Sequence, residues 1–195
     1  MRQEVLKLVS PIPPSVNHYL ATRAILRGGK PLAVTYTTNE AKRFKRDFKE
    51  YVAAECQRQD WRWTPNKYQH FYIDTVYYFP RTDMDPGNYQ KTLFDAITET
   101  QLIWLDDNVA LERVQGVYYD KQNPRIELCI RPVDYIGVFN DASQLAAFEA
   151  NCLGCTRYTR NCSLLKRAKE GRIQNEIQNG VCSAFKTRTK KETEL

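Results

Sequence analysis

Two acidic clusters are the residues of this chain most suited to chemistry. Asp83 and Asp85 follow an aromatic run, and Asp106-Asp107 follows a shorter apolar stretch. Carboxylates that converge on one point repel each other unless a hard divalent cation such as Mg²⁺ offsets their charge. A bound ion activates water and stabilises the leaving oxygen of a phosphodiester, while a lysine such as Lys91 offsets charge developing on the phosphorane. These residue types indicate hydrolytic phosphoryl chemistry.

The same residues also have a purely structural interpretation. The first acidic pair precedes Pro86-Gly87, a dipeptide that favours a turn. Lys91 and Asp95 are spaced for an ion pair on a helix surface, and the second acidic pair is suited to capping. Spacing alone leaves both interpretations open.

Two elements are expected to position the first cluster and Lys91. Residues 70–79 are aromatic and β-branched and are ended by Pro80, which predicts a strand. The pattern of residues 89–99 predicts a helix, on which Lys91 and Asp95 would share a face. The carboxylates would then lie in the bend between this strand and this helix.

The N-terminal part carries further elements. Residues 3–9 alternate apolar and polar side chains and predict a strand, followed by a loop over 12–19. A glycine turn at 28–29 precedes a β-favouring run at 33–36. Residues 39–57 lack Gly and Pro and place apolar side chains on one stripe, which predicts an amphipathic helix. Its other faces are basic: Lys42, Arg43, Lys45, Arg46 and Lys49.

Later strands complete a mixed pattern. Residues 113–119 and 125–131 are expected to form a hairpin around 121–124. Strands and helices intermix, so the fold class is α/β (α+β), with helices packed on a small mixed sheet. The pattern changes after Pro132, which predicts a main domain over 1–132 and an extension over 133–195.

Composition bounds the partners and the location. With 195 residues and 42% hydrophobic content, the chain is long enough for one core with a small appendage. The net charge of +6 favours a polyanionic partner without proving one. No run of about 18 apolar residues is present, and Met1–Ser10 lacks the apolar region of a secretory signal. We expect an intracellular, cytoplasmic protein that does not enter a membrane.

Four of the six cysteines lie in the extension, as Cys152, Cys155, Cys162 and Cys182. Their spacing, C-x2-C-x6-C-x19-C, suits tetrahedral zinc and a small metal-stapled module. An iron–sulfur cluster or unligated thiols are the alternatives, and spacing does not decide among them. The last ten residues, 186–195, are almost all charged or Thr, and we expect them to fray.

A longer pattern resembles a known family. The chain reads Asp83-Met84-Asp85, then Asn88-Tyr-Gln-Lys91-Thr-Leu-Phe-Asp95-Ala-Ile97, then Trp104-Leu-Asp-Asp107. This resembles the signature of the RusA family of Holliday-junction resolvases, D-x-D-N-x-x-K, a helix with D-A-L, and a close such as W-x-D-D. The segment Pro13-Pro-Ser-Val-Asn-His-Tyr19 is similar to the family's opening, P-P-S-x-N-x-Y. The resemblance covers about residues 3 to 132, without the cysteine-rich extension.

The resemblance implies roles for individual residues. Asp83, Asp85 and Asp107 would ligate Mg²⁺, which Mn²⁺ could replace, and Lys91 would be the catalytic lysine. Asp95 and Asp106 would support them. The chain departs from the signature at Pro86-Gly87, which lengthens the path from Asp85 to Lys91 by two residues. This insertion either forms a bulge that leaves the carboxylates in place or displaces Asp85.

The resemblance also implies a substrate and an assembly. The protein would be a bacterial or phage-encoded homodimer that nicks four-way DNA junctions in recombination and repair. The loop over 12–19 and the basic helix over 39–57 then become candidates for phosphate contacts. His18 and His70, the only histidines, have no partner at metal-binding spacing and are interpreted as structural or DNA-contacting.

Three functional hypotheses follow. The first is a structure-selective, Mg²⁺-dependent endodeoxyribonuclease with a zinc-stapled extension. The second is a branched-DNA-binding protein of the same fold whose cleavage is impaired by the Pro86-Gly87 insertion. The third is a phage-type regulator whose cysteine module binds a protein partner.

Overall fold

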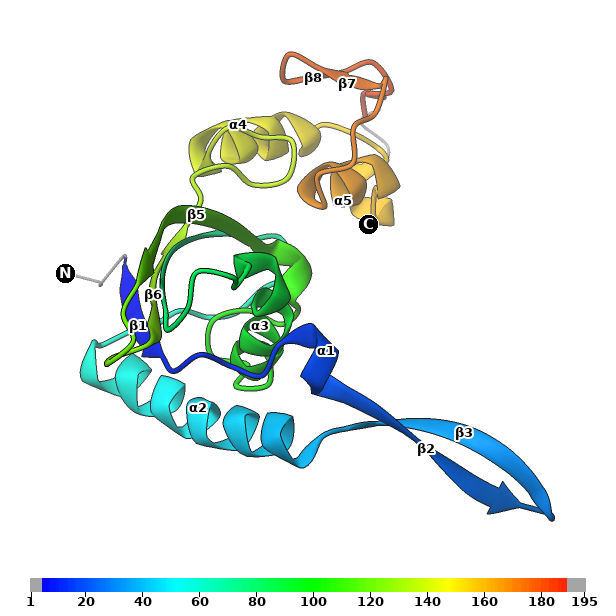
Figure 1. Ribbon diagram of the computed structural model, residues 1–195. Helices are drawn as coiled ribbons and strands as arrows, with labels where there is room; N and C mark the ends of the chain where they lie inside the picture. Colours follow the sequence, from blue (N-terminus) through cyan, green and yellow to red (C-terminus); the bar gives the residue numbers. More distant parts are fainter. Residues whose placement is uncertain (1–4, 189–195) are drawn as a thin grey trace. The chain divides into compact units, whose positions relative to one another are not determined.

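Figure 1 shows the computed structural model, which describes residues 5–188. These residues divide into two compact units: the first comprises 5–66 and 71–132, and the second 67–70 and 133–188. Each unit has a buried core of its own. Within residues 5–188, no helix combines the length and the apolar character needed to cross a membrane.

A four-stranded mixed sheet forms the centre of the first unit (Figure 1). Its strands are β1 (Leu6–Ser10), β4 (Phe71–Phe79), β5 (Ala110–Tyr119) and β6 (Arg125–Pro132). The order is β1-β6-β4-β5, in which β4 and β5 are parallel and the other neighbours antiparallel. The mixed sheet with packed helices confirms the α+β fold class. The strand expected over 3–9 is present as β1, although residues 3 and 4 lie outside the described range.

The predicted hairpin of 113–119 with 125–131 is wrong. Both segments are strands, but β4 lies between them and pairs with each. The connection after β5 crosses the end of β4, where the Asp120 amide donates to the Phe79 carbonyl (2.8 Å). A helical crossover joins β4 to β5 and makes that pair parallel, which leaves the other edge of β4 for β6. Sequence proximity of two strands therefore did not fix their pairing.

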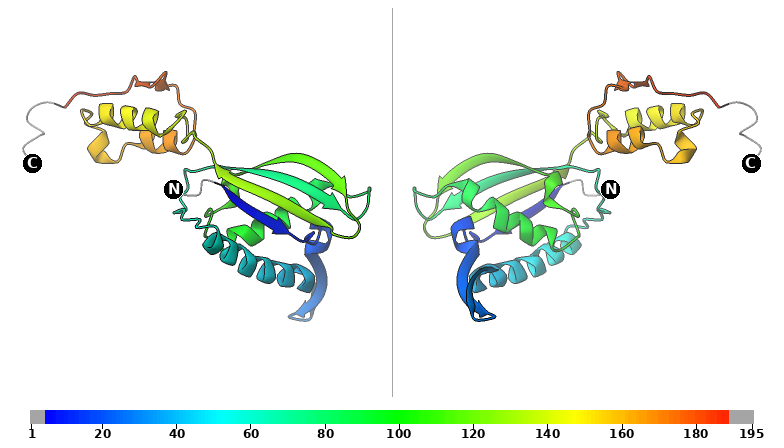
Figure 2. Two further views of the ribbon diagram at one scale, coloured as in Figure 1. Left: turned by 90° about the vertical axis from the view of Figure 1, so that its left-hand side faces the viewer. Right: turned by 90° about the vertical axis from the view of Figure 1, so that its right-hand side faces the viewer.

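Two helices cover one face of this sheet, as Figure 2 shows. They are α2 (Asn39–Arg58), whose N-cap Thr38 side chain accepts from the Ala41 amide, and α3 (Gln90–Thr98). Their buried side chains include Phe48 and Val52 on α2 and Leu93 and Ile97 on α3, which join the sheet in one core. Both helices were predicted, within one residue at each end, from apolar periodicity.

The N-terminal region differs from expectation at two places. The segment predicted as a loop over 12–19 contains a short helix, α1 (Val16–Tyr19). After it, β2 (Leu20–Arg27) and β3 (Lys30–Thr37) form a two-stranded antiparallel hairpin that projects away from the sheet (Figure 1). The predicted turn is correct, because Gly28 and Gly29 both adopt positive φ angles there. The sequence analysis missed β2, since none of its residues is buried and no alternation marks it.

The second unit is small and mainly helical. It contains α4 (Ala142–Cys152), η3 (Tyr158–Arg160), α5 (Ser163–Lys169), β7 (Ile177–Gln178) and β8 (Val181–Cys182). Gly137 has a φ of 59°, and a Cβ there would lie 2.1 Å from the Ala168 carbonyl oxygen, so only glycine permits this approach. The Arg188 amide donates to the Gly154 carbonyl (3.0 Å), and the fraying expected over 186–195 stays a prediction. Residues 189–195 lie outside the described part.

The sheet face away from α2 and α3 carries a polar cluster around Asp74. Arg113 binds its carboxylate through two hydrogen bonds (2.8 and 2.7 Å), and the Gln115 amide donates a third (2.8 Å). The Arg113 guanidinium also lies over the Tyr72 ring, 4.0 Å from its centroid. These interactions lower the pKa of Asp74, with the hydrogen bond from Arg113 as the largest cause.

The lowered pKa of Asp74 predicts how stability depends on pH. A carboxyl whose folded pKa lies below its unfolded value stabilises the fold above the unfolded pKa and loses this contribution as pH falls through the folded pKa. Asp74→Asn should therefore flatten the fall in unfolding free energy below about pH 4. Denaturant unfolding at a series of pH values measures this. Asp60→Asn, an exposed control, should keep the parent's slope, and an unchanged slope in Asp74→Asn would contradict the account.

Candidate active site

The first acidic pair lies in the segment between β4 and α3. Asp83 is exposed, and its Oδ1 pairs with the Arg81 Nε at 3.1 Å. Asp85 is also exposed, and its Oδ1 accepts from the Gly87 amide at 3.0 Å. The Pro86-Gly87 insertion forms a single 3-10 turn, η1 (Pro86–Asn88), that Asp85 caps. One carboxylate oxygen of each aspartate is thus engaged locally, as the structural interpretation expects.

Asp83 and Asp85 both lie close enough to Tyr89 to act on its pKa. Burial raises the pKa of Tyr89, Arg81 lowers it, and both Asp83 and Asp85 raise it electrostatically. The Tyr89 ring packs on Phe79, the last residue of β4, at 5.3 Å between centroids. The aromatic end of the strand therefore anchors the segment that carries both acids.

A further carboxylate in this region was missed by the sequence analysis. Glu112 lies on β5, and its Oε1 accepts from the Tyr77 hydroxyl (2.7 Å) and the Thr75 hydroxyl (3.0 Å). Burial raises the pKa of the fully buried Tyr77, as do Glu112 and, more weakly, Asp85. In the sequence, a single acid within a strand has no spacing signal, and the position of Glu112 opposite Ile73 follows only from the strand pairing. Asp85 and Glu112 thus act on the same tyrosine.

Lys91 belongs to a chain of polar contacts across three helices. Its Nζ lies 3.4 Å from Asp95 Oδ1, one helical turn along α3. The other oxygen of Asp95 accepts from the Tyr19 hydroxyl at 2.8 Å, and Lys45 contacts that hydroxyl at 3.4 Å. Lys45 in turn forms an ion pair with Glu99. Both carboxylate oxygens of Asp95 therefore have a partner, whereas the side chain of Lys91 remains 59% exposed.

The second acidic pair opens the turn that leads into β5. Asp106 caps η2 (Asp107–Val109), accepting from the Asn108 amide at 3.0 Å. Asp107 is half-buried, and within residues 5–188 its carboxylate has no hydrogen-bonding or ion-pairing partner. Trp104 fixes the preceding loop, because it is fully buried and its Nε1 donates to the Thr98 hydroxyl at 2.7 Å.

These carboxylates supply only oxygen donors, the ligands that Mg²⁺ prefers. No group of three or more His, Cys, Asp or Glu side chains in the described part of the chain stands at metal-holding geometry. The residue types fit a hard cation, and Asp107 has both oxygens unengaged. The joining of Asp83, Asp85 and Asp107 at one ion stays a prediction.

The two histidines belong to other segments than these acids. His18 is an exposed residue of α1, and its carbonyl accepts from the Thr38 hydroxyl at 2.8 Å. His70 packs its ring against Tyr135, 5.6 Å between centroids. Neither histidine belongs to a metal-holding group within residues 5–188.

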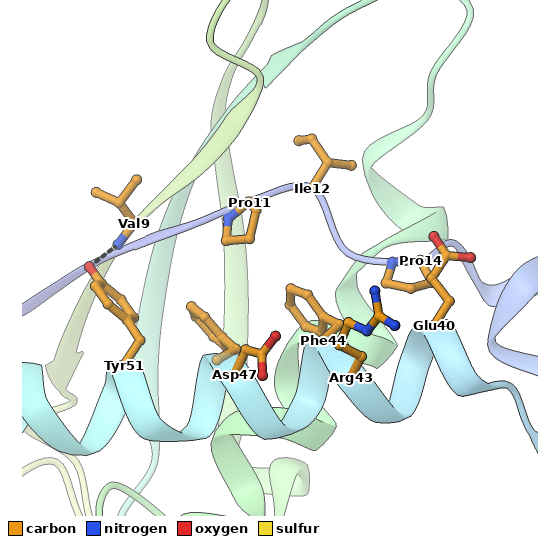
Figure 3. Close-up of a pocket in the computed structure, with 10 residues that line it drawn as sticks. Val9, Pro11, Ile12, Pro14, Glu40, Arg43, Phe44, Asp47 and Tyr51 are labelled. Carbon is orange, nitrogen blue, oxygen red and sulfur yellow. Dashed lines mark hydrogen bonds between the residues drawn. The ribbon is translucent and has the colours of Figure 1, made fainter.

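Two grooves border α2. One, of about 500 Å³, has four cationic side chains in its lining: Lys42, Lys45, Arg46 and Lys49. The other, of about 390 Å³, lies between α2 and the chain from Val9 to Pro14 (Figure 3). There the Tyr51 hydroxyl accepts from the Val9 amide (2.9 Å), so that α2 covers the free edge of β1. The second groove is mainly apolar and none of the predicted acids lines it.

The four C-terminal cysteines line one small cavity in the second unit. Burial raises the pKa of Cys152 to about 11, and the other three thiols act on it in the same direction. At Cys155, burial acts upward, but hydrogen bonds from the amides of Lys186, Arg157 and Tyr158 outweigh it and lower the pKa. The sequence analysis predicted that these four thiols bind one metal ion, and this stays a prediction.

Comparisons with known proteins bear on the first unit. No curated protein matches the chain. Six chains of solved structures match, including a 2C-methyl-D-erythritol 2,4-cyclodiphosphate synthase from Plasmodium vivax. That match has 9% identity and a TM-score of 0.24, and it covers 66% of this chain and 93% of the other, so it carries no argument.

One family model, described as endodeoxyribonuclease RusA, matches residues 11–131. The match covers more than half of the chain and includes all four predicted catalytic residues, and it ends before the cysteine-rich unit. The chain therefore belongs to the RusA family of endodeoxyribonucleases.

Proposed function

We propose that this chain is a Mg²⁺-dependent endodeoxyribonuclease that nicks and resolves Holliday junctions in DNA recombination and repair. Asp83, Asp85 and Asp107 would ligate the ion, which Mn²⁺ could replace, and Lys91 would be the catalytic lysine. The proposal rests on the family, whose members are nucleases that resolve Holliday junctions, act on branched DNA as dimers and typically depend on a divalent metal.

The unpartnered carboxylate of Asp107 is the observation that carries the proposal. Both oxygens of this partly exposed carboxylate are available to a ligand, and a hard divalent cation is the ligand that carboxylate oxygens suit. Asp85 has only Oδ1 engaged, and the contact of Asp83 with Arg81 is exposed, so both can offer an oxygen. Exposed ion pairs contribute little free energy, and the contact with Arg81 is easily exchanged for a metal.

Lys91 is suited to contact a phosphate. Asp95 accepts a hydrogen bond from Tyr19 and forms an ion pair with Lys91, and the Lys91 side chain remains largely exposed. From this position Lys91 would orient the scissile phosphate and offset the negative charge that develops in the transition state. When bound, Mg²⁺ supplies Lewis-acid stabilisation and activates water for the attack.

A basic surface supports nucleic-acid binding. The hairpin residues 20–37 include Arg23, Arg27 and Lys30 and no acid, and the basic groove of α2 begins at the base of this hairpin with Thr37. Lysines and arginines in such a groove would contact backbone phosphates and would position DNA without reading its sequence. The short helix α1, within the predicted 12–19 segment, lies at the same base of the hairpin, where Leu20 pairs with Thr37, and would add contacts.

A homodimer suits this substrate. A four-way junction presents equivalent strands related by two-fold symmetry, and a two-fold dimer presents one active site to each. The proposal therefore includes a homodimer of this chain, acting in the cytoplasm where the DNA of a bacterium or phage is found.

One observation favours the second hypothesis, a branched-DNA-binding protein with impaired cleavage. The Pro86-Gly87 insertion forms η1, and one carboxylate oxygen of Asp85 caps this turn by accepting from the Gly87 amide. If the cap holds Asp85 away from the ion, the protein would bind junctions without cutting them under any divalent cation.

Cleavage by aspartate variants tests the proposed metal ligands. Asp107→Asn and Asp83→Asn should lower junction cleavage by about a hundredfold or more, because even supporting residues of metal sites cost 10- to 100-fold. Single-turnover cleavage of a mobile four-way junction with Mg²⁺ measures this. Asp60→Asn makes the same charge change at an exposed site and should cleave like the parent. Full activity in Asp107→Asn would overturn the assignment, and a parent that binds but never cleaves would favour the impaired form.

Salt dependence tests the basic groove. Replacing Lys42 and Arg46 by Ala should weaken binding to junction and duplex DNA alike and reduce the slope of log K against log salt by about 0.9 for each lost phosphate contact. Fluorescence anisotropy at several salt concentrations, without divalent ions, gives the slope. Arg62→Ala removes a basic side chain outside the groove and should leave the slope unchanged. Equal slopes for all three proteins would exclude the groove as a DNA contact.

A further inference from the structure

The second unit has too small a core to be stable on apolar burial alone. Within residues 5–188, its buried cluster contains four residues, Phe139, Phe148, Leu165 and Ala168, with partly buried hydrophobic side chains packed against them. Domains of this length usually need disulfides or a structural metal, because they bury little apolar surface for each residue that they order. None of the cysteines is in a disulfide. A cross-link of another kind is therefore expected.

The four thiols come from separate elements and meet at one place. Cys152 ends α4, Cys155 follows it in a turn, Cys162 caps α5, and Cys182 lies on β8. All four line the same cavity, together with the apolar side chains of the small core. A single ion at this position would connect both helices and the β7-β8 hairpin.

A backbone amide donates to the sulfur of Cys155, the last residue of the turn from Cys152. The Cys155 amide donates to the Cys152 carbonyl at 2.9 Å, which closes the turn. The Cys155 Sγ accepts from the Lys186 amide at 3.5 Å. Amide hydrogen bonds favour the thiolate form, which is the form that ligates metals. This feature is independent of the cysteine spacing and points to a metal ligand.

We propose that Cys152, Cys155, Cys162 and Cys182 bind one Zn²⁺ as a tetrahedral tetrathiolate that holds the second unit together. Four thiolates around one ion form a closed structural site without an open position for substrate. The reducing interior of a cell keeps such thiols available for metal instead of disulfides.

The size of the cavity favours a single ion over an iron–sulfur cluster. Its volume is about 20 Å³, whereas one water-sized sphere needs about 10–15 Å³. One ion fits this space, but a cluster of several iron and sulfur atoms would have to displace the surrounding core. Within residues 5–188 the thiols are not at ligand geometry, so binding requires their side chains to rotate inward. Binding would release the thiol protons to solvent, and affinity would therefore fall at low pH.

Metal analysis of the full-length protein, purified under reducing conditions, tests the proposal. We expect about one zinc per chain and no iron, and Co²⁺ exchange should give the visible absorption of tetrahedral cobalt with thiolate ligands. Cys152→Ser and Cys182→Ser should each lose most of the bound metal. Cys129→Ser is the matched control, because Cys129 lies on β6 of the first unit, and it should keep full metal content.

A second readout covers the case in which a variant folds poorly. Removing the metal from the parent with a chelator should make the second unit sensitive to limited proteolysis and leave the first unit resistant, and adding Zn²⁺ back should restore resistance. A chain with no bound metal and four freely titrating thiols in the presence of Zn²⁺ would overturn the proposal. Bound iron with visible absorbance would overturn it in favour of a cluster. Unchanged zinc in Cys182→Ser would also contradict it.

Discussion

Strand β4 is the constraint on which the first unit depends, because it pairs along both edges. Its odd-numbered residues from Phe71 to Phe79 are buried under α2 and α3, which fixes its register and its face. The chain leaves β4 directly into the segment with Asp83 and Asp85 and returns through Asp107 into the parallel neighbour, β5. One β-α-β connection therefore carries all three proposed ligands: Asp83 and Asp85 follow the end of β4, and Asp107 precedes β5, whose first residue lies opposite the first residue of β4.

The contacts of Tyr19 link that connection to the rest of the unit. Tyr19 follows the N-terminal loop, bonds to Asp95 on α3 and contacts Lys45 on α2. One phenol thus couples the helix that carries Lys91 to the helix that lines the basic groove. In the proposed function, the groove would hold the DNA backbone while Lys91 contacts the scissile phosphate. A rigid link would serve this function, since small displacements of catalytic groups greatly lower the rate.

The sequence predicted those elements whose burial gives a periodic pattern. Helix α2 was found because its apolar stripe is buried, and β4 because it is aromatic and β-branched throughout. Strand β2 was missed because none of its residues is buried, and the β5–β6 hairpin was wrong because pairing depends on which strand lies between two neighbours. The acids Asp83 and Asp107 were predicted as metal ligands from their residue type and from the resemblance, and this stays a prediction. Glu112 was missed because a single acid within a strand has no spacing signal.

The central claim is that Asp83, Asp85 and Asp107 share one divalent ion. In the described chain each of these carboxylates is engaged differently: one pairs with Arg81, one caps a turn, and one has no partner. A crystal structure with Mn²⁺ and anomalous data tests the claim directly. The account predicts one manganese peak with oxygen ligands from all three aspartates, and a peak bound by other residues while Asp107 stays unligated would contradict it.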